Sequence, residues 1–370
     1  MRGVRGLALA LLVAIASPAL PQAAPDGPAA PLVIAHRGAS AERPEHTLAA
    51  YRLAIEQGAD FIEPDLVMTK DGVLVARHEN EISETTDVAE RPEFAARRTT
   101  KVIDGETVSG WFTEDFTLAE LKRLRARERL PLLRPANRAF DGEETIPTFD
   151  EVVALAKAAP RPVGVYPETK HPSHFRALGL PTEEALLAVL ARHGWSNMRA
   201  RVFIQSFEVG NLKALRARTR LPLVQLVASR GGPPDQPGVG YADMLTDAGL
   251  AAIAAYADAI GVEKSLVIPR GADGRLASAT DLVARAHRAG LKVHAWTFRP
   301  ENHFLPEGLR GPGGPAARGN ANGEIRAYVA AGIDGLFTDS VPPAREALAS
   351  PPATTAPSPQ APSSAGRRGP

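Results

Sequence analysis

The sequence has 370 residues, of which 44% are hydrophobic and 23% charged, and this is an ordinary globular composition. A formal net charge of +1 gives no electrostatic footprint for nucleic acid or for an anionic membrane surface. The chain has no cysteine, which excludes disulfides, thiol nucleophiles and zinc held by cysteine. The length allows two domains, but single α/β barrels also reach this size.

The N-terminus is typical of a secretory signal. Arg2 and Arg5 precede an uncharged apolar run over 6–16, and small residues with proline follow. The run is shorter than a comfortable transmembrane span, so no stable membrane insertion is expected. We expect residues 1–24 to be a cleaved signal peptide and the mature chain to be periplasmic or secreted. An uncleaved membrane anchor is the alternative.

After residue 31, short apolar runs alternate with amphipathic stretches. The first expected elements are a buried strand, a helix closed by glycine, a second strand and a segment that folds back on it after an Asp-Gly turn: 32–35, 47–58, 61–69 and 73–78. A charged stretch over about 80–146 then interrupts this alternation of strands and helices. It shows one clear helical pattern, over 117–127, and two loops, and we interpret it as an insertion.

The alternation resumes at residue 149. The expected helices are 149–159, 183–193, 208–218, 244–257, 279–289, 323–331 and 341–349, and the expected strands are 163–168, 201–206, 223–228, 257–261, 292–297 and 335–338. Eight strand–helix units with an insertion after the second strand predict an α/β fold, a (β/α)8 TIM barrel over 31–349. A doubly wound open sheet predicts a Gly-rich phosphate turn after the first strand, where Gly38 stands alone. The Pro/Ala/Ser-rich tail over 350–370 is expected to be disordered.

Polar side chains gather where the expected strands end. Residues i and i+2 share one face of a strand, and the strand ends of an α/β barrel meet at one rim. The side chains that this places at the rim are His36, Arg37, Glu63, Asp65, Glu168 and Lys170, with His294 and Trp296 on one face near the end of the seventh strand. We therefore expect three carboxylates, a histidine and two positively charged side chains at one end of the barrel.

The three carboxylates indicate a site for a hard divalent cation, Ca²⁺ or Mg²⁺. Without a cation, Glu63, Asp65 and Glu168 would repel one another. The alternative is that they pair with arginine or lysine at the rim. His36 and His78 suit general base and general acid chemistry, and His78 ends the hairpin strand that would hang over the same end of the barrel.

The segment AHRGASAERPEHTLAAYRLAIEQGADFIEPDLVMTKDGVLVARHE (35–79) resembles the signature region of the glycerophosphodiester phosphodiesterase family. It carries HRG, PE-x-T, GAD, E-x-D, TKDG and a closing histidine in that order. YPETK (166–170) and GLFTD (335–339) resemble the third-strand metal motif and the last strand of the family. The likeness runs from about Leu32 to Ala349, with short motifs similar to the exported bacterial branch.

The resemblance implies a (β/α)8 barrel with an insertion after its second strand. It also implies hydrolysis of a small-molecule glycerophosphodiester to glycerol 3-phosphate and an alcohol, with Ca²⁺ or Mg²⁺. The implied site residues are Glu63, Asp65 and Glu168 as metal ligands, His36 and His78 as the acid/base pair, Arg37 and Lys170 as phosphate contacts, and Trp296 as an apolar wall. Gln205 is a candidate substrate contact.

Two residues depart from the family pattern. Glu79 follows His78 where the family usually has Asp, and His46 replaces the commoner Asn in PE-x-T. The Pro/Gly-rich stretch over 297–319 is expected to shape specificity or to form a lid.

Alternatives stay open on several points. A phospholipase D acting on lysophospholipids or sphingolipids would be favoured by an exposed apolar loop, for which Phe304 and Leu305 are the candidates. A non-catalytic barrel would have lost acid/base or metal residues, and here all are present. The residues favour neither water nor the glycerol 2-hydroxyl as nucleophile, and they indicate no head group, metal or oligomeric state.

Overall fold

The computed structural model describes residues 30–349. The predicted signal peptide and tail lie outside these residues. A central sheet joins eleven strands, which are β1 (Leu32–His36), β2 (Phe61–Glu63), β3 (Asp65–Met68), β4 (Leu74–Ala76), β7 (Gly164–Val165), β8 (Glu168–Thr169), β9 (Ile204–Ser206), β10 (Leu223–Val227), β11 (Ala259–Glu263), β12 (Lys292–Phe298) and β13 (Gly335–Thr338).

The sheet curls until its two ends lie close together. Its order is β4-β3-β8-β9-β10-β11-β12-β13-β1-β2-β7, and among these strands only the β3–β4 hairpin is antiparallel. Pro64 separates β2 from β3 and Pro167 separates β7 from β8, since proline cannot donate to a ladder. Because β2 pairs with β7 and β3 with β8, the last strands of the order return to its beginning. The prediction of a TIM-barrel-like α/β fold is confirmed.

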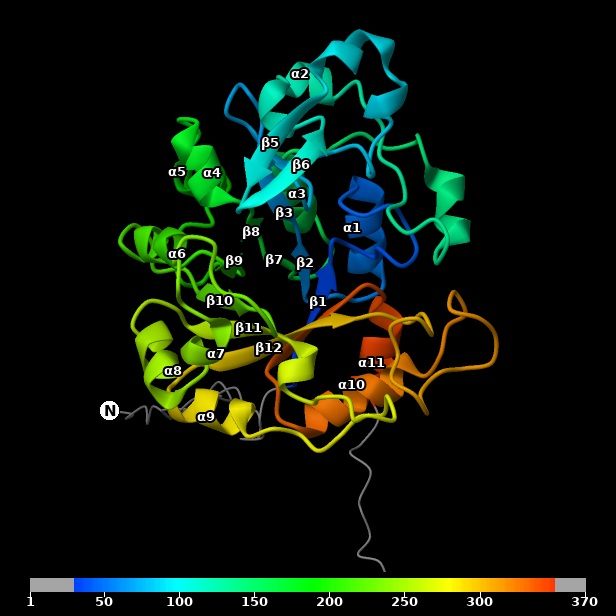
Figure 1. Ribbon diagram of the computed structural model, residues 1–370, viewed down its shortest axis with the longest axis vertical. Coiled ribbons are helices and arrows are strands. Elements are labelled where there is room, and N and C mark those ends of the chain that lie inside the picture. Colours follow the sequence, from blue (N-terminus) through cyan, green and yellow to red (C-terminus); the bar gives the residue numbers. More distant parts are fainter. Residues whose placement is uncertain (1–29, 350–370) are drawn as a thin grey trace, which may run out of the picture.

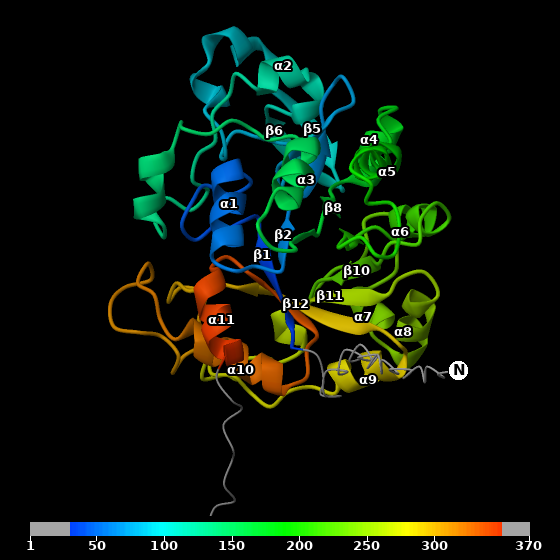
Figure 2. The ribbon, with the colours of Figure 1, turned by 180° about the vertical axis from the view of Figure 1, so that it is seen from behind.

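Helices surround the sheet on the outside (Figures 1 and 2). They are α1 (Leu48–Glu56), α3 (Phe149–Lys157), α4 (Pro172–Ala177), α5 (Thr182–Arg192), α6 (Val209–Arg216), α7 (Tyr241–Met244), α8 (Asp247–Ala254), α9 (Leu282–Arg288), α10 (Ala321–Ala330) and α11 (Val341–Ala349). Threonine side chains cap α1, α3 and α8 by accepting a backbone N–H of the first turn. No helix among residues 30–349 has the length and apolar character to cross a membrane.

The core has two parts because each strand is covered on both faces. The larger cluster lies where the helices pack on the sheet, and a smaller one fills the inside of the curled sheet with Ile34, Phe61, Tyr166, Val224, Ala259 and Phe337. Buried His294 joins the inner cluster, and its Nδ1 lies 2.6 Å from the Tyr166 hydroxyl. His294, which shares a strand face with Trp296, therefore belongs to this inner packing.

The stretch over 80–146 (the 80–146 segment) connects β4 to α3, and its β-hairpin and short helix lie at the top of Figure 1. It contains the hairpin β5 (Thr99–Ile103) and β6 (Glu106–Gly110), α2 (Leu118–Leu121), and the 3₁₀ turns η1 (Val88–Glu90), η2 (Pro92–Arg97), η3 (Thr113–Asp115) and η4 (Pro135–Phe140).

Two expectations for this segment were wrong. The hairpin was expected to be a loop, although its Asp104-Gly105 turn, with φ of 49° and 88°, is a hairpin signal. The helix expected over 117–127 ends at Leu121, because the chain then leaves to pair Ala126 with Thr86.

Candidate active site

The side chains predicted to act together line one cavity at the carboxyl ends of the strands. It has a volume of about 290 Å³, and its lining consists of His36, Arg37, Glu63, His78, Glu168, Lys170, Gln205, Phe207, Leu226, Trp296, Thr297, Arg299 and Phe337. Asp65 lies beside the lining, where its carboxylate is within 3.5 Å of the Lys170 ammonium. The structure thus brings together the side chains expected at the rim except His294, which is buried against Tyr166 inside the curled sheet.

The three carboxylates form a buried cluster. Ligand oxygens of Glu63, Asp65 and Glu168 all lie within 4.8 Å of one another. Strand register produces the cluster, because Asp65 is paired directly with Glu168 across β3 and β8, and Glu63 ends the neighbouring stretch of β2. Pro64 and Pro167 interrupt the ladder beside these residues, so Glu63 ends at a break in the strand while Asp65 and Glu168 begin directly after one.

Charge in this cluster is unbalanced. Burial and repulsion from Asp65 and Glu168 raise the pKa of Glu63 well above 4.5, and burial with the Asp65 charge raises the pKa of Glu168 to about 8. Burial acts on Asp65 in the same direction, but Lys170 and His78 hold the pKa of Asp65 well below 3.8. The pattern describes carboxylates whose burial and mutual repulsion are only partly offset by the neighbouring cationic side chains.

A divalent cation fits this donor set. Among the described residues, Asp65 Oδ1 and Gln205 Oε1 are buried without a hydrogen-bond partner. The Gln205 amide donates to Glu63 Oε1 at 3.0 Å, and the Arg37 backbone N–H donates to Glu63 Oε2 at 2.8 Å. Rigid strand positions, oxygen donors and unsatisfied oxygens are what a hard cation requires.

Arg37 and Lys170 bring positive charge to the same cluster. Lys170 Nζ lies 2.8 Å from Glu168 Oε1, and Arg37 Nη1 donates to Glu45 Oε2 at 3.0 Å. Arg37 adopts a left-handed backbone with φ of 60°, which aims its own N–H at the Glu63 carboxylate while the guanidinium reaches Glu45. Such a conformation is held in place by its surroundings.

Glycine is required after Arg37. Gly38 has φ of 88°, and an added Cβ would lie 2.7 Å from the Ala50 backbone carbon. Gly38→Ala is expected to destabilise the fold by about 1–2 kcal/mol for the backbone and about 1–3 kcal/mol more for the clash. Urea unfolding measures it, and Gly72→Ala is the matched control, because Gly72 has φ of 77° with no atom within 4 Å of the added carbon. Equal losses for the two variants would contradict the predicted clash.

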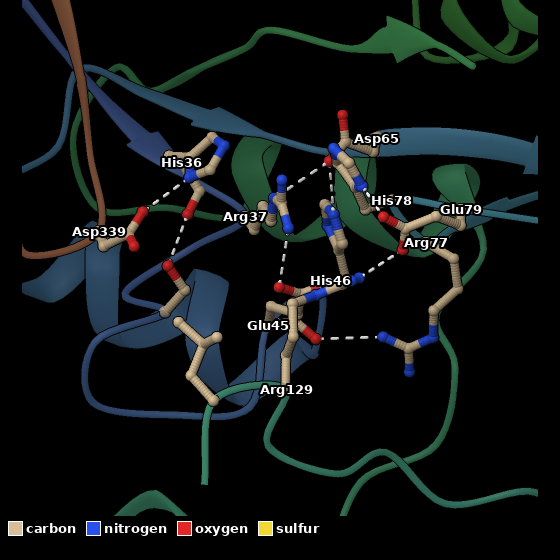
Figure 3. A network of polar contacts seen from close by, with 12 residues as sticks. His36, Arg37, Glu45, His46, Asp65, Arg77, His78, Glu79, Arg129 and Asp339 are labelled. Carbon is tan, nitrogen blue, oxygen red and sulfur yellow. Dashed lines mark hydrogen bonds and ion pairs between the residues drawn. The ribbon is translucent and has the colours of Figure 1, made fainter. Parts of the chain in front are cut away.

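Each candidate catalytic histidine is backed by a carboxylate (Figure 3). His36 Nδ1 lies 2.6 Å from Asp339 Oδ1, and His78 Nδ1 hydrogen-bonds Glu79 Oε1. Arg134, Arg299 and His36 offset the burial of Asp339 and hold its pKa well below 3.8, so this carboxylate accepts and His36 Nδ1 carries the hydrogen. Nε2 is then the basic nitrogen of the neutral ring.

The surroundings favour neutral imidazoles. Burial, with the adjacent Arg37 charge, lowers the pKa of His36 to about 4. Burial, Arg37 and Lys170 lower the pKa of His78 to about 3. Both rings therefore start as proton acceptors at neutral pH in this arrangement of charges.

Several residues that contact the site were not singled out as site residues in the sequence. Glu45, Asp339, Arg129 and Arg134 connect the histidines and Arg37 to the 80–146 segment, and His46 Nε2 lies 2.9 Å from Asp65 Oδ2. Glu45 lies in the PE-x-T motif and Asp339 in the GLFTD motif. These motifs drew attention to the two residues, but they did not indicate what either side chain does. Arg129 and Arg134 carry no local signal.

Apolar side chains form one wall of the cavity, namely Phe207, Leu226, Trp296 and Phe337. The Trp296 indole donates to the Gly261 carbonyl at 3.0 Å, and its ring meets Phe207 edge-on. In the 297–319 loop, Leu305 is buried and Phe304 is half-buried beneath the Arg299 guanidinium. These two residues therefore do not form an exposed apolar patch.

Comparison with known proteins places the chain among phosphodiesterases. Residues 36–342 match the model of the "Glycerophosphoryl diester phosphodiesterase family". A glycerophosphodiester phosphodiesterase of Arabidopsis thaliana is 39% identical over 287 residues, covering 74% of this chain and 76% of the relative. One from Haemophilus influenzae is 29% identical over 306 residues, covering 75% and 80%. The fold is similar to an Oleispira antarctica phosphodiesterase in complex with the product sn-glycerol-3-phosphate, with a TM-score of 0.60, 21% identity and coverage of 87% and 98%.

Proposed function

We propose, because the chain belongs to the glycerophosphoryl diester phosphodiesterase family, that it hydrolyses glycerophosphodiesters to sn-glycerol 3-phosphate and an alcohol. One observation carries the proposal: a buried carboxylate triad and two carboxylate-backed histidines border one cavity. The family assignment supports the reaction, and this geometry supports the roles proposed below for the individual side chains.

We infer further that the fold is a complete (β/α)8 barrel with the 80–146 segment inserted after the second strand. The pairing of β2 with β7 and of β3 with β8 supports closure. β2 and β3 are the two halves of one strand, and β7 and β8 are the two halves of its neighbour. Their pairing therefore connects the last strands of the sheet order to the first. The position of the segment between β4 and α3 supports the insertion.

Glu63, Asp65 and Glu168 would hold the divalent cation, and Ca²⁺ and Mg²⁺ both suit an all-oxygen donor set. When bound by these carboxylates, a cation would offset negative charge that develops on the phosphate oxygens. Arg37 and Lys170 border the same cavity and would contact the remaining phosphate oxygens. Trp296 offers an apolar wall to the glycerol or to the leaving group.

His36 and His78 supply proton transfer in this proposal. One imidazole removes a proton from the nucleophile, which is water or the glycerol 2-hydroxyl. The other, on the opposite side of phosphorus, is the general acid: because its pKa is lowered in the free site, it takes up a proton at Nε2 as the anionic phosphodiester binds and then gives that proton to the departing alkoxide. The carboxylates at Nδ1 orient both rings and favour the imidazolium that forms transiently.

Export remains a proposal that rests on residues 1–24, where two arginines precede an apolar run and small residues. N-terminal sequencing of the mature protein from the periplasmic or culture fraction tests it.

Chelation tests the reaction. With glycerophosphocholine as substrate, EDTA is expected to abolish the release of glycerol 3-phosphate, and excess Ca²⁺ or Mg²⁺ should restore it. A coupled glycerol-3-phosphate dehydrogenase assay measures the product, and lysophosphatidylcholine tests the phospholipase D alternative in parallel. Full activity in EDTA, or no release with either cation, would contradict the proposal.

A further inference from the structure

We infer that Arg129 and Arg134, both in the 80–146 segment, are positioning residues that orient the two candidate catalytic histidines, each through one carboxylate. The inference rests on the proposed function and adds residues that neither the family motifs nor the comparisons assign. Its basis is a pair of parallel connections, Arg129–Glu79–His78 and Arg134–Asp339–His36.

The first connection runs to His78. Arg129 Nη2 donates to Glu79 Oε2 at 2.6 Å, while Glu79 Oε1 hydrogen-bonds His78 Nδ1. Glu79 stands where the family usually has Asp, and its longer side chain reaches both partners. The Glu79 side chain is 38% exposed, so the fixed guanidinium is what restrains an otherwise mobile carboxylate. Figure 3 shows these side chains together.

Arg129 also reaches the phosphate-binding side of the site. Its Nε and Nη2 donate to Glu45 Oε1 at 2.9 and 2.7 Å, and Glu45 Oε2 accepts from Arg37 Nη1 at 3.0 Å. One guanidinium therefore connects the carboxylate behind His78 to the carboxylate behind Arg37. This requires a planar group with several fixed donors, which lysine does not have.

The second connection runs to His36. Arg134 Nη2 donates to Asp339 Oδ2 at 2.5 Å, and Asp339 Oδ1 lies 2.6 Å from His36 Nδ1. Arg134 also donates to Glu301 Oε1 at 2.7 Å and to the Ser40 carbonyl at 2.8 Å. Both side chains of the Arg134–Asp339 pair are at most 5% exposed, so this connection is enclosed.

The two connections differ in how replaceable the arginine is. Arg299 Nε also donates to Asp339 Oδ2, at 3.0 Å, so Asp339 keeps one cation when Arg134 is lost. Apart from the His78 ring, Arg129 is the one partner of Glu79 among the contacts of the described residues. The His78 connection should therefore be the more sensitive one.

The test compares Arg129→Met and Arg129→Lys with Arg127→Met. Arg127 lies two residues earlier in the same segment and pairs with Glu90 at the surface, which makes it a matched control. With glycerophosphocholine and saturating cation, Arg129→Met should lower kcat about 10- to 100-fold, the usual effect of losing a partner that orients a site residue. Arg129→Lys should recover part of the kcat, and Arg127→Met should match the unmodified protein.

A double-variant cycle separates positioning from a general structural effect. In a Glu79→Gln background, Arg129→Met should leave kcat unchanged and raise only KM, through the Glu45–Arg37 contact. Equal proportional losses of kcat in both backgrounds would overturn the inference, as would a normal kcat in Arg129→Met. An unmodified protein without turnover would instead reject the proposed function, so the two failures are distinguishable.

Arg134→Met completes the test, with circular dichroism and Tm reporting whether the variant folds. Its kcat should fall less than that of Arg129→Met, and adding Arg299→Met should lower kcat by more than the product of the single effects. A folded Arg134→Met with unchanged kcat, in both the presence and the absence of Arg299, would overturn the His36 half of the inference.

Discussion

His36→Ala is expected to lower kcat on a glycerophosphodiester by about 10²–10⁴-fold, the usual contribution of one general acid or base. His36 borders the cavity, and its Nδ1 is occupied by Asp339 at 2.6 Å, so Nε2 is the nitrogen left for proton transfer. Alanine removes that nitrogen without altering Glu63, Asp65 or Glu168. Steady-state release of glycerol 3-phosphate at saturating cation measures the loss.

The same loss is expected for His78→Ala, and a second substrate separates the two roles. A glycerophosphodiester with a p-nitrophenol leaving group needs no proton on the departing oxygen, so the variant without the general acid should recover on it and the other should not. His287→Ala is the control, because His287 lies on α9 and pairs with Asp334 outside the cavity. Recovery of both variants, or of neither, would contradict the division into one acid and one base.

Local periodicity and barrel topology were enough to predict which carboxylates would meet. Glu63 and Asp65 share a strand face two residues apart, and the ends of parallel strands converge, so the position of Glu168 beside Asp65 follows from strand order alone. The structure shows this juxtaposition, while the roles of these residues in metal binding stay predictions. The breaks at Pro64 and Pro167 were missed, because 61–69 and 163–168 were each expected to be one strand, although proline interrupts a ladder.

Long-range polar partners could not be predicted in the same way. Asp339 and Arg134 are 205 positions apart in the sequence, and their contact depends on how the 80–146 segment folds back over the mouth. That segment has little periodicity, because it joins the main core through scattered side chains such as Phe94, Phe116 and Leu124 and not along one amphipathic face. The helix expected over 117–127 failed for this reason, because tertiary pairing of Ala126 outweighed helix propensity.

The metal-free protein is expected to lose stability as the pH rises from about 6.5, the ordinary pKa of histidine, to about 8. Burial and mutual repulsion raise the pKa of Glu63 well above 4.5 and that of Glu168 to about 8, so the folded chain holds protons that the unfolded chain has already released. The stability linked to these protons is complete below the unfolded pKa and is lost as the pH rises through the folded pKa. Asp65, with its pKa held well below 3.8, acts in the opposite direction in strong acid. His36 and His78, with pKa values lowered to about 4 and about 3, also act in the opposite direction, but only up to about pH 6.5, where the unfolded imidazoles lose their protons.

Thermal unfolding of EDTA-treated protein across this pH range measures the effect, and Glu63→Gln should reduce it. The amide cannot ionise, and Gln205, whose Oε1 has no partner among the described residues, can turn its own amide to accept from it. The variant should therefore melt higher than metal-free wild type at pH 8, while Glu56→Gln, at the exposed end of α1, should not.

Cation binding should invert the ranking of these two proteins. At about 100 times its Kd, a cation bound by Glu63, Asp65 and Glu168 adds about 2.7 kcal/mol to the stability of the wild type. Glu63→Gln lacks one of these ligands and should gain much less. If neither Ca²⁺ nor Mg²⁺ raises the wild-type Tm at pH 8, or if Glu63→Gln melts below the metal-free wild type there, the triad is stabilised by its own lysine and arginine neighbours and does not need a cation.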